Sequence, residues 1–128
     1  MARLEFFNDL FLPVNEIAQF ALPTLLASGR PAIRHLHQFV SECRQKTCEG
    51  LQKFSSGSAT FLPPTAGFYG VIRVESDAQA LALQLLREHH LLVHPGHFYD
   101  MLENHLVFSY VHSPKELAIG LKILGEKI

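Results

Sequence analysis

Apolar residues recur at helical spacing behind Asn15, in the first part of the chain. The spacings of three and four residues are those of one helix face, and Asn15 is a residue type that caps helix starts. Gly29 stands where such a helix would stop. Pro23 lies inside the pattern and predicts a kink or a split, because proline removes a helical hydrogen bond. The pattern therefore predicts a first helix over 15–28.

A second and more regular helical pattern follows, from Pro31 to Phe54. Proline is common in a first helical turn, and the apolar positions behind it keep the spacing of one amphipathic face. At about 1.5 Å per residue this helix would be on the order of 36 Å long, close to the diameter of a globule of this size. A helix of that length is better suited to connecting two bodies. Cys43 and Cys48 fall on different faces of it, which disfavours a local disulfide and fits a reducing cytoplasm.

The second half of the chain changes to a mixed pattern. Residues 55–67 are rich in Ser, Gly, Pro and Thr, and predict a loop. Alternating β-branched and aromatic residues over 68–75 predict a strand. A Leu- and Ala-rich stretch over 78–88 predicts a helix, with Ser76 and Gln79 as its capping box.

Two more short strands and a last helix complete the predicted order. A strand over 91–94 is closed by a Pro-Gly turn, and another covers 105–111. Ser113 and Glu116 form a capping box around a first-turn proline, before a final helix with an apolar stripe. Helices followed by β-α-β-β-α predict an α+β fold with a two-layer sandwich. The expected parts are a helical segment 1–54, a loop 55–67 and an α+β domain 68–128.

The composition shows that the chain has a low fraction of charged residues. Charged residues make up 18% of its 128 residues and hydrophobic residues 48%, with a mean hydropathy of +0.12, against about 25% charged in typical domains. Two interpretations stay open: part of the surface is covered by another domain or subunit, or the domain is simply apolar. A net charge of −1 without a basic run disfavours nucleic acid as a partner.

Neither a membrane nor a secretory route is indicated by the sequence. The longest uncharged stretch, residues 54–72, is interrupted by Ser, Gly and Pro, so it predicts no transmembrane helix. The first residues do not have the pattern of a signal peptide. The chain is therefore expected to be soluble and cytoplasmic.

Histidines gather between His89 and His97, with His90 and His94 between them. A zinc site needs three or four ligands that converge, whereas a helix end followed by a strand and a turn makes these side chains diverge. No metal is therefore expected, and a His-rich metal carrier is the weakest hypothesis. The common motifs of nucleophilic, zinc-dependent and phosphate-binding sites are absent. Arg73 could bind a carboxylate, but strand alternation places it on the solvent face.

The segment His94–Tyr99 combines a strand end, a Pro-Gly turn and two aromatic residues. Gly96 permits a close approach of another group, and a rigid strand end can present the aromatic side chains. The alternative is an ordinary turn whose aromatic side chains fold onto the core. The residues alone favour that alternative.

Several of these motifs, taken in order, resemble the C-terminal small domain of the class I/II (fold-type I) pyridoxal-phosphate-dependent aminotransferases. Upstream, the chain is similar to the segment that follows the Schiff-base lysine in that family. The resemblance covers about Asp9 to Ile128. The stretches that carry it are Asn8–Val14, Gln19–Leu26, Pro64–Val74, Glu88–Tyr99 and Leu106–Tyr110.

The resemblance implies a C-terminal fragment of an enzyme that transfers amino groups from an amino acid to an oxo acid. In the family, pyridoxal phosphate is bound mostly by a larger N-terminal domain that carries the lysine, and the full enzyme is expected to be a homodimer. This chain would lack that domain, so we expect no catalytic residue, no bound cofactor and no transamination by the fragment alone. None of its lysines stands in the Ser-rich motif of the family: Lys46, Lys53, Lys115, Lys122 and Lys127.

The resemblance also implies which residues face the substrate. Gly67 and Phe68 match the glycine and aromatic residue at the start of the first small-domain strand, although Ala66 stands where a second glycine is common. A Pro-Gly turn would lead a loop toward the active site, and two aromatic residues would form its wall. The complete set is Gly67, Phe68, Pro95, Gly96, His97, Phe98 and Tyr99.

One position departs from the pattern of many family members. Val107 stands where they have an arginine that binds the substrate α-carboxylate through two hydrogen bonds. The resemblance therefore does not imply ordinary α-amino-acid recognition, and the amino acid or oxo acid stays open. A helix that links two domains would explain the length of the predicted helix 31–54. A surface covered by another domain or subunit would explain the apolar composition.

A different class of function remains as the alternative. The order β-α-β-β-α also resembles ferredoxin-like sandwiches, some of which bind amino acids as stand-alone or regulatory modules. The helical first half is not needed by such a module, and it favours the aminotransferase reading.

Overall fold

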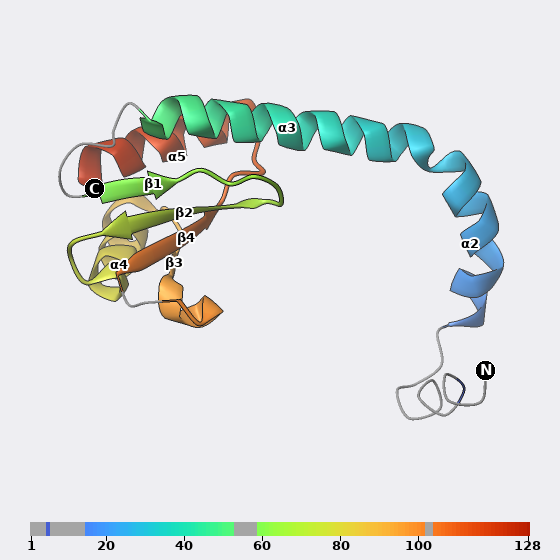
Figure 1. Ribbon diagram of the computed structural model, residues 1–128, viewed down its shortest axis with the longest axis horizontal. Coiled ribbons are helices and arrows are strands. Elements are labelled where there is room, and N and C mark those ends of the chain that lie inside the picture. Colours follow the sequence, from blue (N-terminus) through green and yellow to red (C-terminus); the bar gives the residue numbers. More distant parts are fainter. Residues whose placement is uncertain (1–4, 6–14, 53–58, 102–103) are drawn as a thin grey trace. The chain divides into compact units, whose positions relative to one another are not determined.

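The computed structural model describes residues 5, 15–52, 59–101 and 104–128. The chain forms two compact units, Met1–His37 and Gln38–Ile128. Figure 1 shows the elements and their order along the chain. Each unit is described by itself below.

The first unit contains helix α2, Glu16–Ser28, and the start of helix α3, Arg30–Gln52. The predicted cap is confirmed, because the Asn15 side chain accepts hydrogen bonds from the backbone N–H groups of Ile17 and Ala18 at 2.9 and 3.4 Å. The predicted stop at Gly29 is confirmed as well.

The predicted split at Pro23 is wrong, since α2 runs unbroken through it. Proline removes one backbone donor, and the helix continues beyond it to Ser28. The long second helix is confirmed as α3, which begins one residue before Pro31. Its predicted last residue, Phe54, lies outside the described residues.

No residue of α2 is buried. Its exposed side chains are strongly apolar: Phe20 is 92% exposed and Ile17 80%. The exposed apolar set of this unit is Ile17, Phe20, Leu22, Leu25, Leu26, Ile33 and Leu36. The structure thus accounts for the apolar composition by apolar side chains that lie on the surface of this unit.

The second unit contains a four-stranded sheet and its helices. Its strands are β1 Ala59–Leu62, β2 Tyr69–Val74, β3 His94–Pro95 and β4 His105–Ser109, in the order β1-β2-β4-β3, and every neighbouring pair is antiparallel. β2 and β3 therefore run parallel to each other with β4 between them, and helix α4, Ala78–His89, connects them. This is a split β-α-β arrangement, and with the final helix α5, Pro114–Lys127, it confirms the α+β class.

Two predictions about strands are wrong. The predicted loop 55–67 contains β1, which pairs with β2 from Ala59↔Val74 to Leu62↔Val71. Its local pattern is weak because it is a four-residue edge strand with one buried side chain, Phe61. The predicted strand 91–94 is reduced to the two residues of β3, because His90 takes a left-handed conformation with φ 54° that ends α4.

The helix caps of this unit were predicted in part. The capping box of Ser113 and Glu116 at the start of α5 is confirmed, with the proline at its first positions. The predicted cap at Ser76 is wrong. Asp77 caps α4 instead, and its carboxylate accepts from the N–H groups of Gln79 and Ala80 at 2.8 and 3.3 Å.

The hydrophobic core lies between one face of the sheet and the helices. The largest fully buried side chains are Tyr110, Leu85, Leu106 and Thr47, and the Thr47 hydroxyl donates to the Cys43 carbonyl at 2.9 Å. The core residues come from α3, α4, α5, the strands and the residues that flank β3 and β4: Cys43, Leu51, Phe61, Ile72, Val74, Ala78, Ala82, Leu85, Val93, Leu106, Phe108, Tyr110, Leu117, Leu121 and Leu124.

The opposite face of the sheet carries the alternate strand residues. The register places Leu62, Val71, Val107 and His94 in one row across the four strands. Val107 sits on the inner strand β4 and is only 4% exposed, although it does not belong to the core cluster. This face is therefore apolar at its centre.

None of the helices in the described ranges is long and apolar enough to cross a membrane.

Candidate functional site

Aromatic rings from β2, β3 and the short 3-10 helix η1, Gly96–Tyr99, cluster together. The His94 and Tyr99 rings are stacked, with centroids 5.9 Å apart and an interplanar angle of 24°. His94 also faces Phe98 at 5.8 Å, and Tyr69 of β2 faces Tyr99 at 6.2 Å. His97 packs edge-on against Phe98 at 4.8 Å. We call these residues the aromatic cluster: Tyr69, His94, His97, Phe98 and Tyr99.

A hydrogen bond and a tight turn hold this cluster in place. The Tyr99 hydroxyl and His94 Nδ1 are 2.8 Å apart and share a hydrogen bond whose direction depends on the histidine tautomer. Beneath the rings, Pro95 and Gly96 are buried, and the Gly96 carbonyl accepts from Met101 N–H at 3.1 Å. η1 ends at Asp100, whose φ of 55° is left-handed. The rings are thus carried by a fixed turn at the strand end.

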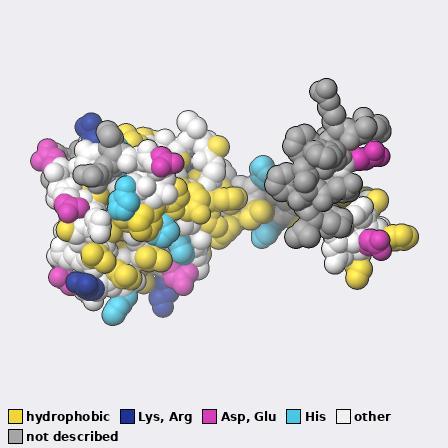
Figure 2. Space-filling view, turned by 90° about the horizontal axis from the view of Figure 1, so that it is seen from below, with side chains coloured by type: hydrophobic (Ala, Val, Ile, Leu, Met, Phe, Trp, Pro, Cys, Tyr) yellow, Lys and Arg dark blue, Asp and Glu magenta, His cyan; other side chains and the backbone are white. Residues whose placement is uncertain are grey.

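The rings of the cluster are paired with one another yet remain open to solvent. Phe98 is 66% exposed, Tyr69 52% and Tyr99 41%. Aromatic side chains offer large contact areas with few rotatable bonds, and grouped exposed ones are typical of binding surfaces. In Figure 2, hydrophobic and histidine side chains lie next to one another over the second unit, seen from the side where β3 and η1 lie in Figure 1.

A buried tyrosine fastens the turn that leads into β2. The Tyr110 hydroxyl donates to the Gly67 carbonyl at 2.6 Å, and the Tyr110 N–H donates to the Phe68 carbonyl at 3.1 Å. Gly67 has a φ of +86°, a left-handed conformation that favours glycine, and a Cβ there would meet no atom within 4 Å. The glycine is therefore needed for backbone conformation and not for space.

Charge near Tyr110 supports the same segment. Burial raises the pKa of the Tyr110 phenol above its usual value of 10.0, and the positive charge of Arg44 in α3 partly opposes this rise. The Arg44 guanidinium also donates to the Pro64 carbonyl at 3.4 Å. The segment before β2 is thus held at Pro64 by α3 and at Gly67 and Phe68 by Tyr110.

Replacing Tyr110 with phenylalanine tests this attachment. The ring packing is kept and one hydrogen bond is lost, so we expect the free energy of unfolding to fall by about 1 kcal/mol and amide exchange around Gly67 to accelerate. Because the folded pKa lies above 10.0, the neutral phenol stabilises the fold fully below pH 10.0, and this stabilisation is lost as the pH rises further. Of the three tyrosines, the last to ionise in an ultraviolet titration should be missing from the variant. Unchanged amide exchange around Gly67 would contradict the attachment.

The structure brings together part of the predicted site. His97, Phe98 and Tyr99 lie in the aromatic cluster, with Pro95 and Gly96 buried below them. The alternative in which these aromatic side chains fold onto the core is wrong for Phe98 and Tyr99, which are exposed. Gly67 and Phe68 directly precede Tyr69, and Phe68 is 48% exposed.

The sequence analysis singled out the segment His94–Tyr99 but did not place His94 or Tyr69 among the site residues, and it missed Tyr110 as a support. Tyr69 belongs to the predicted strand 68–75. β4 pairs with β2 on one side and with β3 on the other, and the Tyr69 ring faces that of Tyr99 in η1. A single sequence carries no signal for that pairing, apart from the alternation that puts Tyr69, Val71 and Arg73 on one face. The predicted solvent exposure of Arg73 is confirmed.

The surroundings of Val107 are apolar. Its strand neighbours in register are Val71 on β2 and His94 on β3. Arg73 pairs in register with His105, one row further along the face. The central row thus contains no arginine, lysine, aspartate or glutamate, and a carboxylate placed over Val107 would have no permanent cation from this row, where His94 is the one titratable group.

Metal ligands and lysines can be located among the described residues. No group of three or more His, Cys, Asp or Glu among them is placed to hold a metal ion. The described lysines are exposed on α3 and α5, away from the strands and η1 that carry the aromatic cluster: Lys46, Lys115, Lys122 and Lys127. An amine that could bind an aldehyde cofactor is therefore not present in the cluster.

The fold matches a recurrent part of solved aminotransferase structures. The chain aligns with aspartate aminotransferase from Thermotoga maritima at a TM-score of 0.81 and 20% identity, covering 95% of this chain and 31% of that one. With the α-aminoadipate aminotransferase of Thermus thermophilus, complexed with N-(5′-phosphopyridoxyl)-L-leucine, the TM-score is 0.78 at 20% identity, over 94% and 32% of the two chains. With an alanine aminotransferase from Pyrococcus furiosus it is 0.79 at 17% identity, over 94% and 31%.

No protein-family model and no curated protein matches the sequence. The structural likeness shows that the chain has an aminotransferase-like fold, as the resemblance in the sequence predicted. The chain spans about a third of the length of the solved structures it matches.

Proposed function

We propose that this chain is the small domain of a pyridoxal-phosphate-dependent aminotransferase and that its aromatic cluster lines the substrate side of the active site. The observation that carries the proposal is the match of nearly the whole chain to one third of several aminotransferases. The exposed and mutually fixed rings supply a binding surface within that fold.

In this proposal the reaction chemistry comes from pyridoxal phosphate held by another part of the enzyme. The cofactor acts as an electron sink while an amino group is transferred between an amino acid and an oxo acid. The residues of this chain bind and orient the substrate. Phe98 and Tyr99 contact its side chain and exclude water from it, and the hydrogen bond to His94 keeps the Tyr99 ring in position.

The apolar row around Val107 restricts what can be bound there. A carboxylate of the substrate would need its cation from outside this row, while an apolar or aromatic side chain fits it without a desolvation penalty. We therefore propose that the substrate group which meets this face is its side chain.

The partner in the proposal is the domain that binds pyridoxal phosphate, within a homodimeric enzyme. The support for a partner is the exposed apolar surface of α2, with Phe20 and Ile17 almost fully exposed. An exposed apolar surface of this kind is expected to be buried against another domain or subunit in the whole enzyme. The two free thiols, Cys43 and Cys48, fit a reducing compartment, so the proposal includes a cytoplasmic location.

The first test is to sequence the genomic DNA upstream of the Met1 codon. We expect an in-frame region that encodes a larger domain with a Ser-rich lysine motif. Transamination by the protein from that whole frame should then show a KM about tenfold higher after Phe98→Ala, because an aromatic contact contributes up to about 1.5 kcal/mol. Leu83→Ala, an exposed change on α4, is the control and should leave KM unchanged. A stop codon immediately upstream would contradict the proposal.

A stand-alone amino-acid-binding module is the second candidate. The split β-α-β sheet is the observation that favours it. Its test is the melting temperature of the 128-residue chain in the presence of free amino acids without cofactor. A saturable rise would support the module, because a ligand that binds only the folded state raises its stability. The small-domain proposal predicts no rise.

A further inference from the structure

A second concave site lies in the same unit, between the end of α4, strand β4 and helix α5. Its volume is about 360 Å³, within the range of small-molecule pockets. The floor is formed by core side chains, among them Val93, Phe108 and Leu121. No residue of the aromatic cluster lines it, so it is distinct from the candidate substrate surface.

The lining of this pocket also contains polar groups. Three imidazoles, those of His89, His90 and His112, line it together with the Glu116 carboxylate. Glu116 is held at that position because its Oε2 accepts from the Ser113 hydroxyl at 2.6 Å and from the Ser113 N–H at 3.2 Å. The same hydrogen bonds lower the pKa of Glu116, which keeps it ionised at neutral pH.

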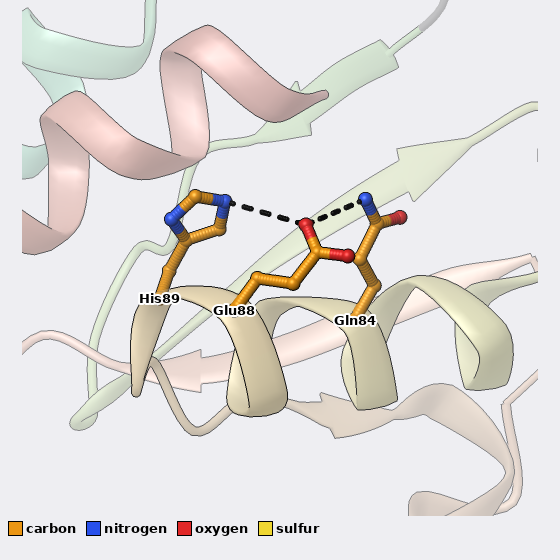
Figure 3. Close-up of polar contacts among 3 residues, drawn as sticks. All are labelled: Gln84, Glu88 and His89. Atoms are coloured by element: carbon orange, nitrogen blue, oxygen red, sulfur yellow. Dashed lines mark hydrogen bonds and ion pairs between the residues drawn. The ribbon is translucent and has the colours of Figure 1, made fainter.

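His89 lies next to a carboxylate. Its Nε2 is buried and lies 3.9 Å from Glu88 Oε2, and that carboxylate oxygen also accepts from Gln84 Nε2 at 3.1 Å. Figure 3 shows Nε2 of His89 turned toward the carboxylate of Glu88, which lies on the same helix, α4. The imidazole therefore lines the pocket with a second carboxylate next to it.

The charge of the residues that line the pocket decides which ligands it can bind. Glu116 lines the pocket, Glu88 stands behind His89, and no lysine or arginine is among the lining residues. An anionic ligand would meet these carboxylates without a permanent cation to compensate. A hydroxyl group is better matched, because it can donate to a carboxylate and can pair with an imidazole in either tautomer.

We propose that this pocket binds a neutral, mainly apolar molecule about the size of a bicyclic aromatic, with a hydroxyl group that pairs with a histidine or Glu116 of the lining. Apolar burial supplies most of the affinity and the hydroxyl fixes the orientation. The site is independent of the proposed aminotransferase role, since it uses none of the residues assigned to substrate.

Gly120 offers a variant that fills the pocket without disturbing the fold. It lies inside α5, and a Cβ added there would meet only Leu91 Cδ1, at an ordinary contact distance of 3.5 Å. Leucine is a better helix former than glycine, so Gly120→Leu should fold and occupy the pocket. Ala118→Leu is the matched control, because Ala118 is exposed on the same helix and does not line the pocket.

The test is a titration of the 128-residue chain with naphthol, naphthalene and naphthoate, followed by backbone amide NMR. We expect naphthol to shift the resonances of pocket residues around 91–93 and 117–124 in a saturable way, with a Kd several-fold lower than that of naphthalene or naphthoate. Gly120→Leu should weaken naphthol binding at least tenfold, and Ala118→Leu should leave it unchanged.

Other outcomes would overturn the proposal. These are the absence of saturable shifts at pocket residues, equal affinity in Gly120→Leu, tighter binding of naphthoate, or shifts confined to the aromatic cluster. His89→Phe provides a second readout, because it keeps a ring in the wall and removes both nitrogens. His89→Phe should reduce the preference for naphthol over naphthalene. Gly120→Leu, by contrast, should remove the binding of both compounds.

Discussion

Replacing Gly70 with alanine is expected to destabilise the second unit by about 1–3 kcal/mol, the usual cost of overpacking a core. A Cβ on Gly70 would lie 2.6 Å from Cζ and 2.8 Å from Cε1 of Phe108 on the neighbouring strand. Both residues are buried, and the ring has to shift before the added methyl group fits. Without that clash, alanine would be favoured over glycine in a strand by about 0.5–1 kcal/mol. Denaturant unfolding of the two proteins measures the difference.

A double-mutant cycle with Phe108→Leu separates the clash from other effects of the added methyl group. Leucine in place of Phe108 removes the ring atoms that Gly70 approaches. Gly70→Ala should therefore cost much less in the Phe108→Leu protein than in the original one. An equal cost in both backgrounds would show that contact with the ring is not the cause.

Replacing Leu85 with alanine is expected to lower the free energy of unfolding by about 2–5 kcal/mol. Leu85 is 0% exposed and lies in the core cluster on the inner face of α4. Its loss leaves a cavity among side chains of the sheet and helices. Leu83→Ala, on the same helix and 42% exposed, should cost only about 0.5 kcal/mol.

Thermal or denaturant melting of both variants checks this contrast. The two changes delete the same atoms from the same helix, so helix propensity cancels in the comparison. The difference between them measures core packing at Leu85. Similar losses in the two variants would mean that α4 is not packed as described.

Features fixed by residues close in sequence could be predicted. Asn15 and Ser113 cap the helices that follow them, and the alternation of residues 69–74 predicted β2. β1 and β3 depend on pairing with strands distant in the chain, and their own patterns are weak. The cap of α4 was missed because Ser76 and Asp77 are both good capping residues and only the geometry distinguishes them.

The candidate site was predicted in the same uneven way. The Pro-Gly turn and the aromatic pair Phe98 and Tyr99 are contiguous, so the sequence displays them together. Tyr69 and Tyr110 reach the site through the register of β2 and β4 and through a hydrogen bond to Gly67. Such long-range contacts leave no periodic signal in a single sequence.

The burial pattern indicates that α2 and the second unit are under different evolutionary constraints. The core begins with residues near Phe39 and Cys43, while no residue of α2 is buried. A polar substitution at Phe20 would therefore pass unnoticed in a melting curve of the second unit. Its effect would be on association and solubility, so this helix can evolve under pressure from whatever it contacts, without constraint from the folding of the sheet.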